Sequence, residues 1–107
     1  MDAMNRRGFL LTVLTPAIAL VANEVHAQPP PRLVADNKTR YYVDVLAWNG
    51  SGWNFNLRLN PGAWTAFPNA PNGSLWRAVI GQVVRDHTVR YVYDPGYRGY
   101  QDVWWIQ

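Results

Sequence analysis

Apolar and polar residues alternate over several short stretches of this chain. The clearest is 53–59 (WNFNLRL), in which odd positions are apolar and even positions are polar. A period of two places the apolar side chains on one face of an extended strand, whereas a helix repeats every ~3.6 residues. Residues 41–48 (YYVDVLAW) are rich in β-branched and aromatic side chains and also predict a strand. Turn residues at 49–52 (NGSG) separate the two stretches.

Further turn sequences divide the second half of the chain. Asn60-Pro61-Gly62 suits a type II turn, because Pro61 fixes its own φ and Gly62 accepts a positive φ. Asp94-Pro95-Gly96 is turn chemistry of the same kind. We therefore expect a strand at 64–67, a loop at 68–74, a strand at 89–93, an aromatic loop at 97–100 and a last strand at 102–106.

Residues 75–84 fit two interpretations. Their apolar residues have helical spacing, and Ser74 could cap a helix at about 75–85, which would make the fold α+β. Gly81 and four β-branched residues oppose a helix, so we favour a hairpin here, with a turn at 85–88 before the next strand. The resulting fold class is all-β, a small antiparallel sandwich or barrel of about six strands.

The first 27 residues have the layout of a cleaved signal peptide. An uncharged run at 9–22 follows two arginines, and Val25-His26-Ala27 offers small or compact residues to a signal peptidase. The run is shorter than the ~20 apolar residues of a spanning helix and Pro16 interrupts it, so a permanent membrane anchor is not expected. Cleavage after Ala27 would leave residues 28–107.

The stretch Asn5-Arg6-Arg7-Gly8-Phe9-Leu10 resembles the twin-arginine export signal. Two positions depart from that pattern, because Asn5 stands where Ser or Thr is usual and Leu11 where Lys is frequent. The general secretory route also accepts an arginine pair and stays open as an alternative. The resemblance implies that export machinery reads Arg6 and Arg7, that a signal peptidase then cleaves the leader, and that the protein is periplasmic or secreted.

The remaining sequence predicts a tether and one domain. Pro29-Pro30-Pro31 favours extended polyproline geometry, so we expect a tether at 28–39 and a single domain at 40–107. Residues 28–107 contain eight basic and five acidic residues and no cysteine. The basic residues are spread along the chain, which argues against a nucleic-acid partner. Without disulfides, stability must come from packing, and aromatic rings are the obvious source.

Enzymatic chemistry has few candidate residues here. Residues 28–107 contain no Glu and a single histidine, His87, and the two serines, Ser51 and Ser74, lie in turn sequences. The Asp86–His87 pair lacks the further ligands that a metal site needs. We therefore expect no enzyme activity, no cofactor and no metal.

The surplus of aromatic residues is the main functional signal. Residues 28–107 contain six Trp, six Tyr and two Phe, and a domain of this size buries only ~60% of its unfolded surface, so some rings must be exposed. The candidate ligand-binding residues are Trp53 and Trp64, which flank turns, and Tyr97, Arg98 and Tyr100, which share one loop. Exposed rings can stack on sugars or anchor a protein interface. We expect a binding module for a carbohydrate or other envelope ligand; the alternative is an interaction protein that self-associates or serves as an accessory subunit.

Overall fold

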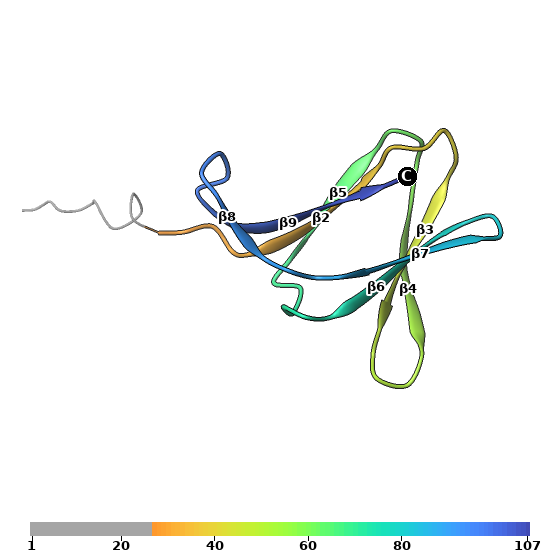
Figure 1. The fold of residues 1–107 in the computed structure, drawn as a ribbon, viewed down its shortest axis with the longest axis horizontal. Helices are drawn as coiled ribbons and strands as arrows, with labels where there is room; N and C mark the ends of the chain where they lie inside the picture. The colour runs from red at the N-terminus through yellow and green to blue at the C-terminus, as the bar shows by residue number, and fades with distance from the viewer. Residues whose placement is uncertain (1–26) are drawn as a thin grey trace, which may run out of the picture.

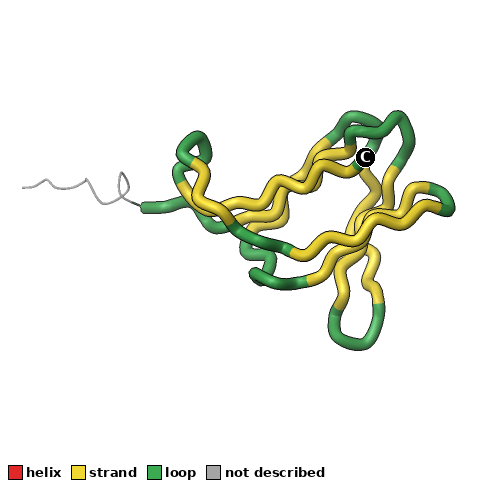
Figure 2. The backbone as a smooth tube through the Cα atoms, in the orientation of Figure 1, coloured by secondary structure: helices red, strands yellow, loops and turns green. Residues whose placement is uncertain are grey.

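A computed structural model describes residues 27–107, and within this range it contains only strands, turns and loops (Figure 2). The predicted leader, with Arg6 and Arg7, lies outside the described residues except for Ala27. No helix in the described range is long and apolar enough to cross a membrane. The strands are β2 (Arg32–Asn37), β3 (Val43–Trp48), β4 (Trp53–Leu59), β5 (Trp64–Pro68), β6 (Leu75–Ile80), β7 (Val83–Thr88), β8 (Val92–Asp94) and β9 (Gly99–Ile106).

These strands form two four-stranded sheets that pack as a small β-sandwich (Figure 1). Sheet 1 has the order β5-β2-β9-β8, and sheet 2 has the order β4-β3-β6-β7. The chain passes from sheet 2 to sheet 1 after β4, through the turn at Asn60–Gly62, and again after β7. The predicted all-β class is therefore confirmed, and of the two predicted architectures, sandwich or barrel, the structure has the sandwich, with eight strands in place of about six.

The core lies between the two sheets and follows the alternation of the strands. On β2, Leu33 and Ala35 point inward and are fully buried, and on β3 Val43 and Val45 do the same. Aromatic rings fill the larger gaps, as expected for a domain without disulfides. The other buried core residues are Leu59, Ala70, Trp76, Ala78, Val89, Trp104 and Ile106.

Strand β2 corrects the expectation of a tether at 28–39. Residues 32–37 form an inner strand, antiparallel to β5 on one side and parallel to β9 on the other. The stretch contains only three apolar residues in a row (LVA) between a proline run and polar residues, so it gave no alternating pattern. Its parallel pairing with β9 also makes sheet 1 mixed, whereas we expected antiparallel pairing throughout.

The residues before β2 are also held to the domain. The Tyr97 hydroxyl donates to the Pro30 carbonyl at 2.6 Å, and the Asn69 N–H donates to the Pro31 carbonyl at 2.7 Å. Pro29 lies so close to Gly99 that a Cβ added at this glycine would be 3.0 Å from the proline ring. The folded domain thus begins near residue 29, well before residue 40.

Residues 75–88 form the hairpin of β6 and β7, and the alternative helix at about 75–85 is not present. The turn is at Gly81–Gln82, and Gly81 has a φ of 61°, as the first residue of a type II′ turn requires. The expectation of a turn at 85–88 was wrong, because these residues continue β7. Asp86 pairs with Arg77 across the hairpin, and this cross-strand ion pair supports the strand conformation.

Candidate functional site

The outer face of sheet 1 has two exposed tryptophans on either side of a carboxylate. Asp36 on β2 lies opposite Trp64 on β5 and opposite Trp105 on β9. Trp64 is 58% exposed and Trp105 is 55% exposed. Because the two rings project from strands that flank β2, their backbones are about 10 Å apart, twice the spacing between neighbouring strands.

Small apolar residues form the floor beside this row. Two residues before Asp36 on β2, Val34 lies opposite Ala66 on β5 and Val103 on β9. Val34 is on the outer face and is still only 7% exposed. The result is a shallow, open groove, which we call the sheet 1 groove; its lining residues are Arg32, Val34, Asp36, Trp64, Gln101 and Val103.

A hydrogen-bonded network holds the polar end of the groove. Arg32 Nε donates to Gln101 Oε1 at 2.9 Å, and Gln101 Nε2 donates to Asp94 Oδ2 at 2.6 Å. The Arg32 guanidinium also stacks over the Tyr97 ring, 4.0 Å from its centroid. The Gln101 amide and the Gly96 N–H hold the pKa of Asp94 below its ordinary value. Arg32 and Gln101 are therefore positioned before any ligand arrives, which lowers the entropy cost of binding.

The opposite end of the groove has a matching ion pair. Lys38 Nζ lies 3.2 Å from Asp36 Oδ2 and 4.9 Å from the centroid of the Trp105 ring. Asp36 thus offsets Lys38 at this end, and Asp94 offsets Arg32 at the other. The groove and the adjoining Trp105 together offer two rings, an apolar floor and hydrogen-bonding groups with no excess of either charge.

The five residues predicted as a ligand site do not come together. Trp64 lines the groove, and Tyr97 contributes to it through Arg32. Trp53 lies on sheet 2, where its ring contacts Trp48 at a centroid distance of 5.3 Å. The two remaining residues, Arg98 and Tyr100, are exposed elsewhere, in the turn before β9 and beside Tyr93.

Tyr97 has two partners within the domain, because its hydroxyl donates to the Pro30 carbonyl and its ring stacks under the Arg32 guanidinium. Sequence reasoning also missed Trp105, Asp36 and Arg32. Trp105 was visible as an aromatic residue in an expected strand, but its partners depend on the parallel register with β2. The first and last strands of the described range pair there, and no local sequence pattern indicates that pairing.

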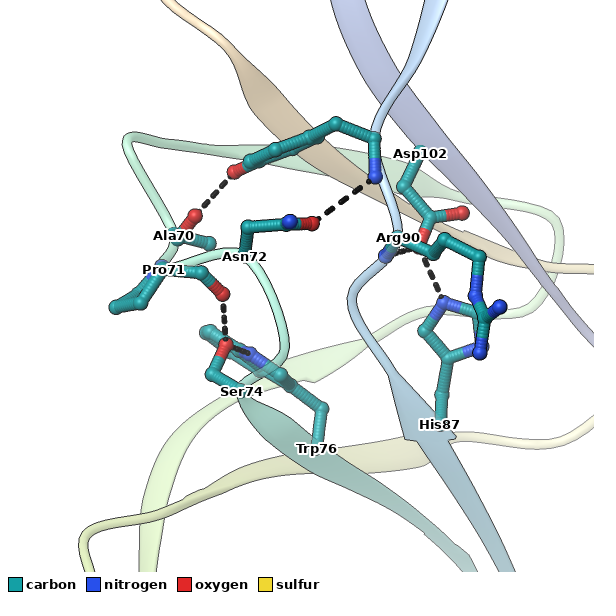
Figure 3. Close-up of polar contacts among 9 residues, drawn as sticks. Ala70, Pro71, Asn72, Ser74, Trp76, His87, Arg90 and Asp102 are labelled. Carbon is teal, nitrogen blue, oxygen red and sulfur yellow. Dashed lines mark hydrogen bonds and ion pairs between the residues drawn. The ribbon is translucent and has the colours of Figure 1, made fainter.

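A second polar cluster lies between the sheets (Figure 3). His87 Nε2 on β7 is 2.7 Å from Asp102 Oδ2 on β9, and the same carboxylate accepts the Arg90 N–H at 2.8 Å. The His87 ring stacks on Trp104, with centroids 5.0 Å apart. Because β7 and β9 belong to different sheets, this cluster ties sheet 2 to sheet 1.

The serine near this cluster does not complete a catalytic triad. Ser74 Oγ donates to the Pro71 carbonyl at 2.6 Å and accepts from Trp76 Nε1 at 3.0 Å, and the structure records no hydrogen bond between it and His87 in the described range (Figure 3). Ser74 therefore shapes the turn before β6. Among residues 27–107, no group of three His, Cys, Asp or Glu side chains is placed to hold a metal ion.

Comparisons were made with models of protein families, with curated proteins and with solved structures, and no match to this chain was found.

Proposed function

We propose that this protein is an exported, non-enzymatic binding module whose sheet 1 groove binds a neutral carbohydrate chain. The observation that carries the proposal is the row Trp64–Asp36–Trp105, two exposed rings with a carboxylate between them. Trp rings stack on the C–H faces of sugars, and a carboxylate accepts hydrogen bonds from hydroxyls. Two rings that project from backbones about 10 Å apart could contact separate sugar rings of one extended chain.

The charges of the groove favour a neutral sugar over an acidic one. Asp36 and Asp94 offset Lys38 and Arg32, so the groove offers hydrogen bonds without a net field that would select an anion. The open shape of the groove suits a polymer that lies across it, since a small ligand would be mostly uncovered.

Binding should depend on Trp64, which lines the groove, and on Trp105, which adjoins it beside Asp36. We expect Trp64→Ala and Trp105→Ala each to weaken binding to a neutral polysaccharide by tenfold or more, equivalent to about 1.4 kcal/mol per ring. Affinity electrophoresis against a panel of neutral and acidic polysaccharides, together with Trp fluorescence titration, measures this effect. Tyr93→Ala is the matched control, because Tyr93 is 49% exposed on β8, where its ring packs against Tyr100 and lies outside both the groove and the outer face of sheet 2. Equal loss of affinity in the control, or no binding to any member of the panel, would contradict the proposal.

The export step rests on the leader. If the twin-arginine route is used, replacement of Arg6 and Arg7 by Lys is expected to stop export, because a planar guanidinium is not interchangeable with an ammonium. Cell fractionation and immunoblotting of the precursor measure this outcome, with a Lys38→Arg variant as a control for substitution outside the leader. Normal export of the Lys-Lys variant would assign the protein to the general secretory route.

A second candidate function, a protein interface, is favoured by a different surface. The outer face of sheet 2 exposes Trp48 and Phe55 on the far side of the sandwich from the groove. The two surfaces do not share residues, so both functions can belong to one protein.

A further inference from the structure

The outer face of sheet 2 combines exposed apolar residues with two ion pairs. Phe55 is 61% exposed, Val84 45% and Trp48 42%, and each projects away from the core. The Trp48 and Trp53 rings pack edge to face near the tip of the β3–β4 hairpin, which extends beyond the sandwich (Figure 1). This surface is separate from the sheet 1 groove, so a role for it does not depend on carbohydrate binding.

The strand registers alternate apolar pairs with charged pairs on this face, an arrangement that we call the checkerboard. Across one row, from β4 to β7, Phe55 and Leu46 are followed by Arg77 and Asp86. Across the adjacent row, Arg58 and Asp44 are followed by Val79 and Val84. The apolar half of one row therefore lies beside the charged half of the other.

Each charged half of the checkerboard is one Arg–Asp ion pair with no net charge. Arg58 Nε is 2.7 Å from Asp44 Oδ1, and Arg77 Nε is 2.7 Å from Asp86 Oδ1. The arginine hydrogen bonds hold the pKa of both carboxyls below their ordinary value, so both aspartates are ionised at neutral pH. The Arg77 guanidinium also covers the Trp53 ring at 4.1 Å, which fixes its position on the face.

The charge distribution favours a second copy of this chain as the occupant of the face. Its two ion pairs sum to zero, whereas the rest of residues 28–107 contains six basic and three acidic residues. Two copies that meet through this face avoid the repulsion between their positively charged surfaces. A strongly charged partner would find no complementary field here.

We propose that two copies of this protein associate face to face through the outer face of sheet 2. In an isologous contact, each copy uses the same residues. The twofold axis then lies in the plane of the contact and runs over Leu46 and Val79. Each of these two residues meets its counterpart in the other copy. Arg77 of one copy meets Asp44 of the other. The strands of the two copies then cross steeply, as in orthogonal sheet packing. The checkerboard makes this axis favourable, because it matches apolar with apolar residues and Arg with Asp.

Cysteine crosslinking can test the contact cleanly, because the chain has no cysteine. We expect Val79→Cys, at the axis, to give a covalent dimer in high yield with a short bis-maleimide. Val92→Cys is the matched control, since Val92 is 65% exposed on β8 of sheet 1 and lies outside the contact. Equal crosslinking of the two variants would overturn the proposal.

Sedimentation of the purified protein gives a second measurement. The mass of the wild-type protein should rise from monomer to dimer with concentration, and Phe55→Asp should lower the association constant by tenfold or more. Val84→Glu provides an independent variant at the opposite corner of the face, and far-UV circular dichroism verifies that both variants fold. A wild-type protein that stays monomeric at several hundred micromolar, or a dimer that neither folded variant weakens, would overturn the proposal. The Phe55→Asp monomer should still bind polysaccharide through the sheet 1 groove. Failure of the dimer proposal can therefore be distinguished from failure of the carbohydrate proposal.

Discussion

A protein that begins at Arg40 is expected not to fold. This truncation removes β2, which lies between β5 and β9 and hydrogen-bonds to both. Leu33 and Ala35 are fully buried in the core, so their loss opens a cavity between the sheets as well as breaking sheet 1. Cavities of this size cost several kcal/mol, and a small domain has only about 5–15 kcal/mol of stability in total.

Circular dichroism and thermal unfolding distinguish the outcomes of this truncation. A protein that begins at Gln28 should retain the β signal and unfold cooperatively, and it serves as the control. The protein that begins at Arg40 should show neither property. A cooperative transition near that of the control would mean that residues 28–39 are dispensable for folding. The original expectation that they form a tether would then hold.

Sequence patterns predicted the fold best where each element is defined by its own residues. The alternation at 53–59 identified β4, and Pro61 and Gly62 identified the turn after it, where Gly62 has a φ of 75° and Ala63 N–H donates to the Asn60 carbonyl at 3.0 Å. Gly81 opposed a helix correctly, although the sequence did not reveal that it forms the hairpin turn itself. These features depend on local steric preferences, which are determined by the residue types at those positions.

Prediction failed where the conformation depends on distant segments. β2 is a strand because β5 and β9 pair with it, and its own sequence lacks a periodic pattern. The site shares this dependence: Trp64 was selected because it flanks a turn, whereas Trp105 and Asp36 join it only through the register of β2. Side-chain types indicated an aromatic surface, and topology determined which rings share a face.

The two aromatic faces lie on opposite sides of the sandwich, which has a consequence for binding. A dimer through the outer face of sheet 2 would leave both sheet 1 grooves exposed and directed away from each other. Two grooves on one particle can bind separate stretches of a polymer, and the second contact then occurs at a high effective concentration. Modest affinity in each groove would be sufficient for firm attachment to a polysaccharide.

The replacement of Asn37 by Ala is expected to destabilise the domain more than the loss of any exposed ring. Asn37 is fully buried, and its side-chain amide donates to the Tyr41 carbonyl at 2.7 Å and to the Asn60 carbonyl at 3.0 Å. Its side-chain oxygen accepts the Thr39 N–H at 2.9 Å. An unpaired buried polar group costs about 1–3 kcal/mol, so the loss of several partners should lower the free energy of unfolding by about 3 kcal/mol or more.

Chemical denaturation measures that loss, and Asp36→Ala is the matched control. Asp36 is the preceding residue of β2 and projects from the outer face, where it pairs with Lys38 near the surface. The pair lies at the surface, with the Lys38 side chain 47% exposed and that of Asp36 14% exposed, and surface ion pairs contribute about 1 kcal/mol or less, so the control should be destabilised less. Comparable losses in the two variants would mean that the Asn37 hydrogen bonds do not determine the stability of this corner.

The isosteric change Asn37→Asp should add a dependence on pH that Asn37→Ala lacks. The new carboxyl would face the Tyr41 and Asn60 carbonyl oxygens that now accept the amide, so burial and these oxygens should raise its pKa above the ordinary Asp value of about 3.9. A group whose pKa is raised on folding favours the folded state most below its unfolded pKa, and that advantage is lost as pH rises through the folded pKa. The melting temperature of Asn37→Asp should therefore approach that of the wild type near pH ~3 and fall increasingly below it toward pH ~7. A difference from the wild type that stays constant over this range would show that the new carboxyl has escaped to solvent and that this corner of the core is not rigid.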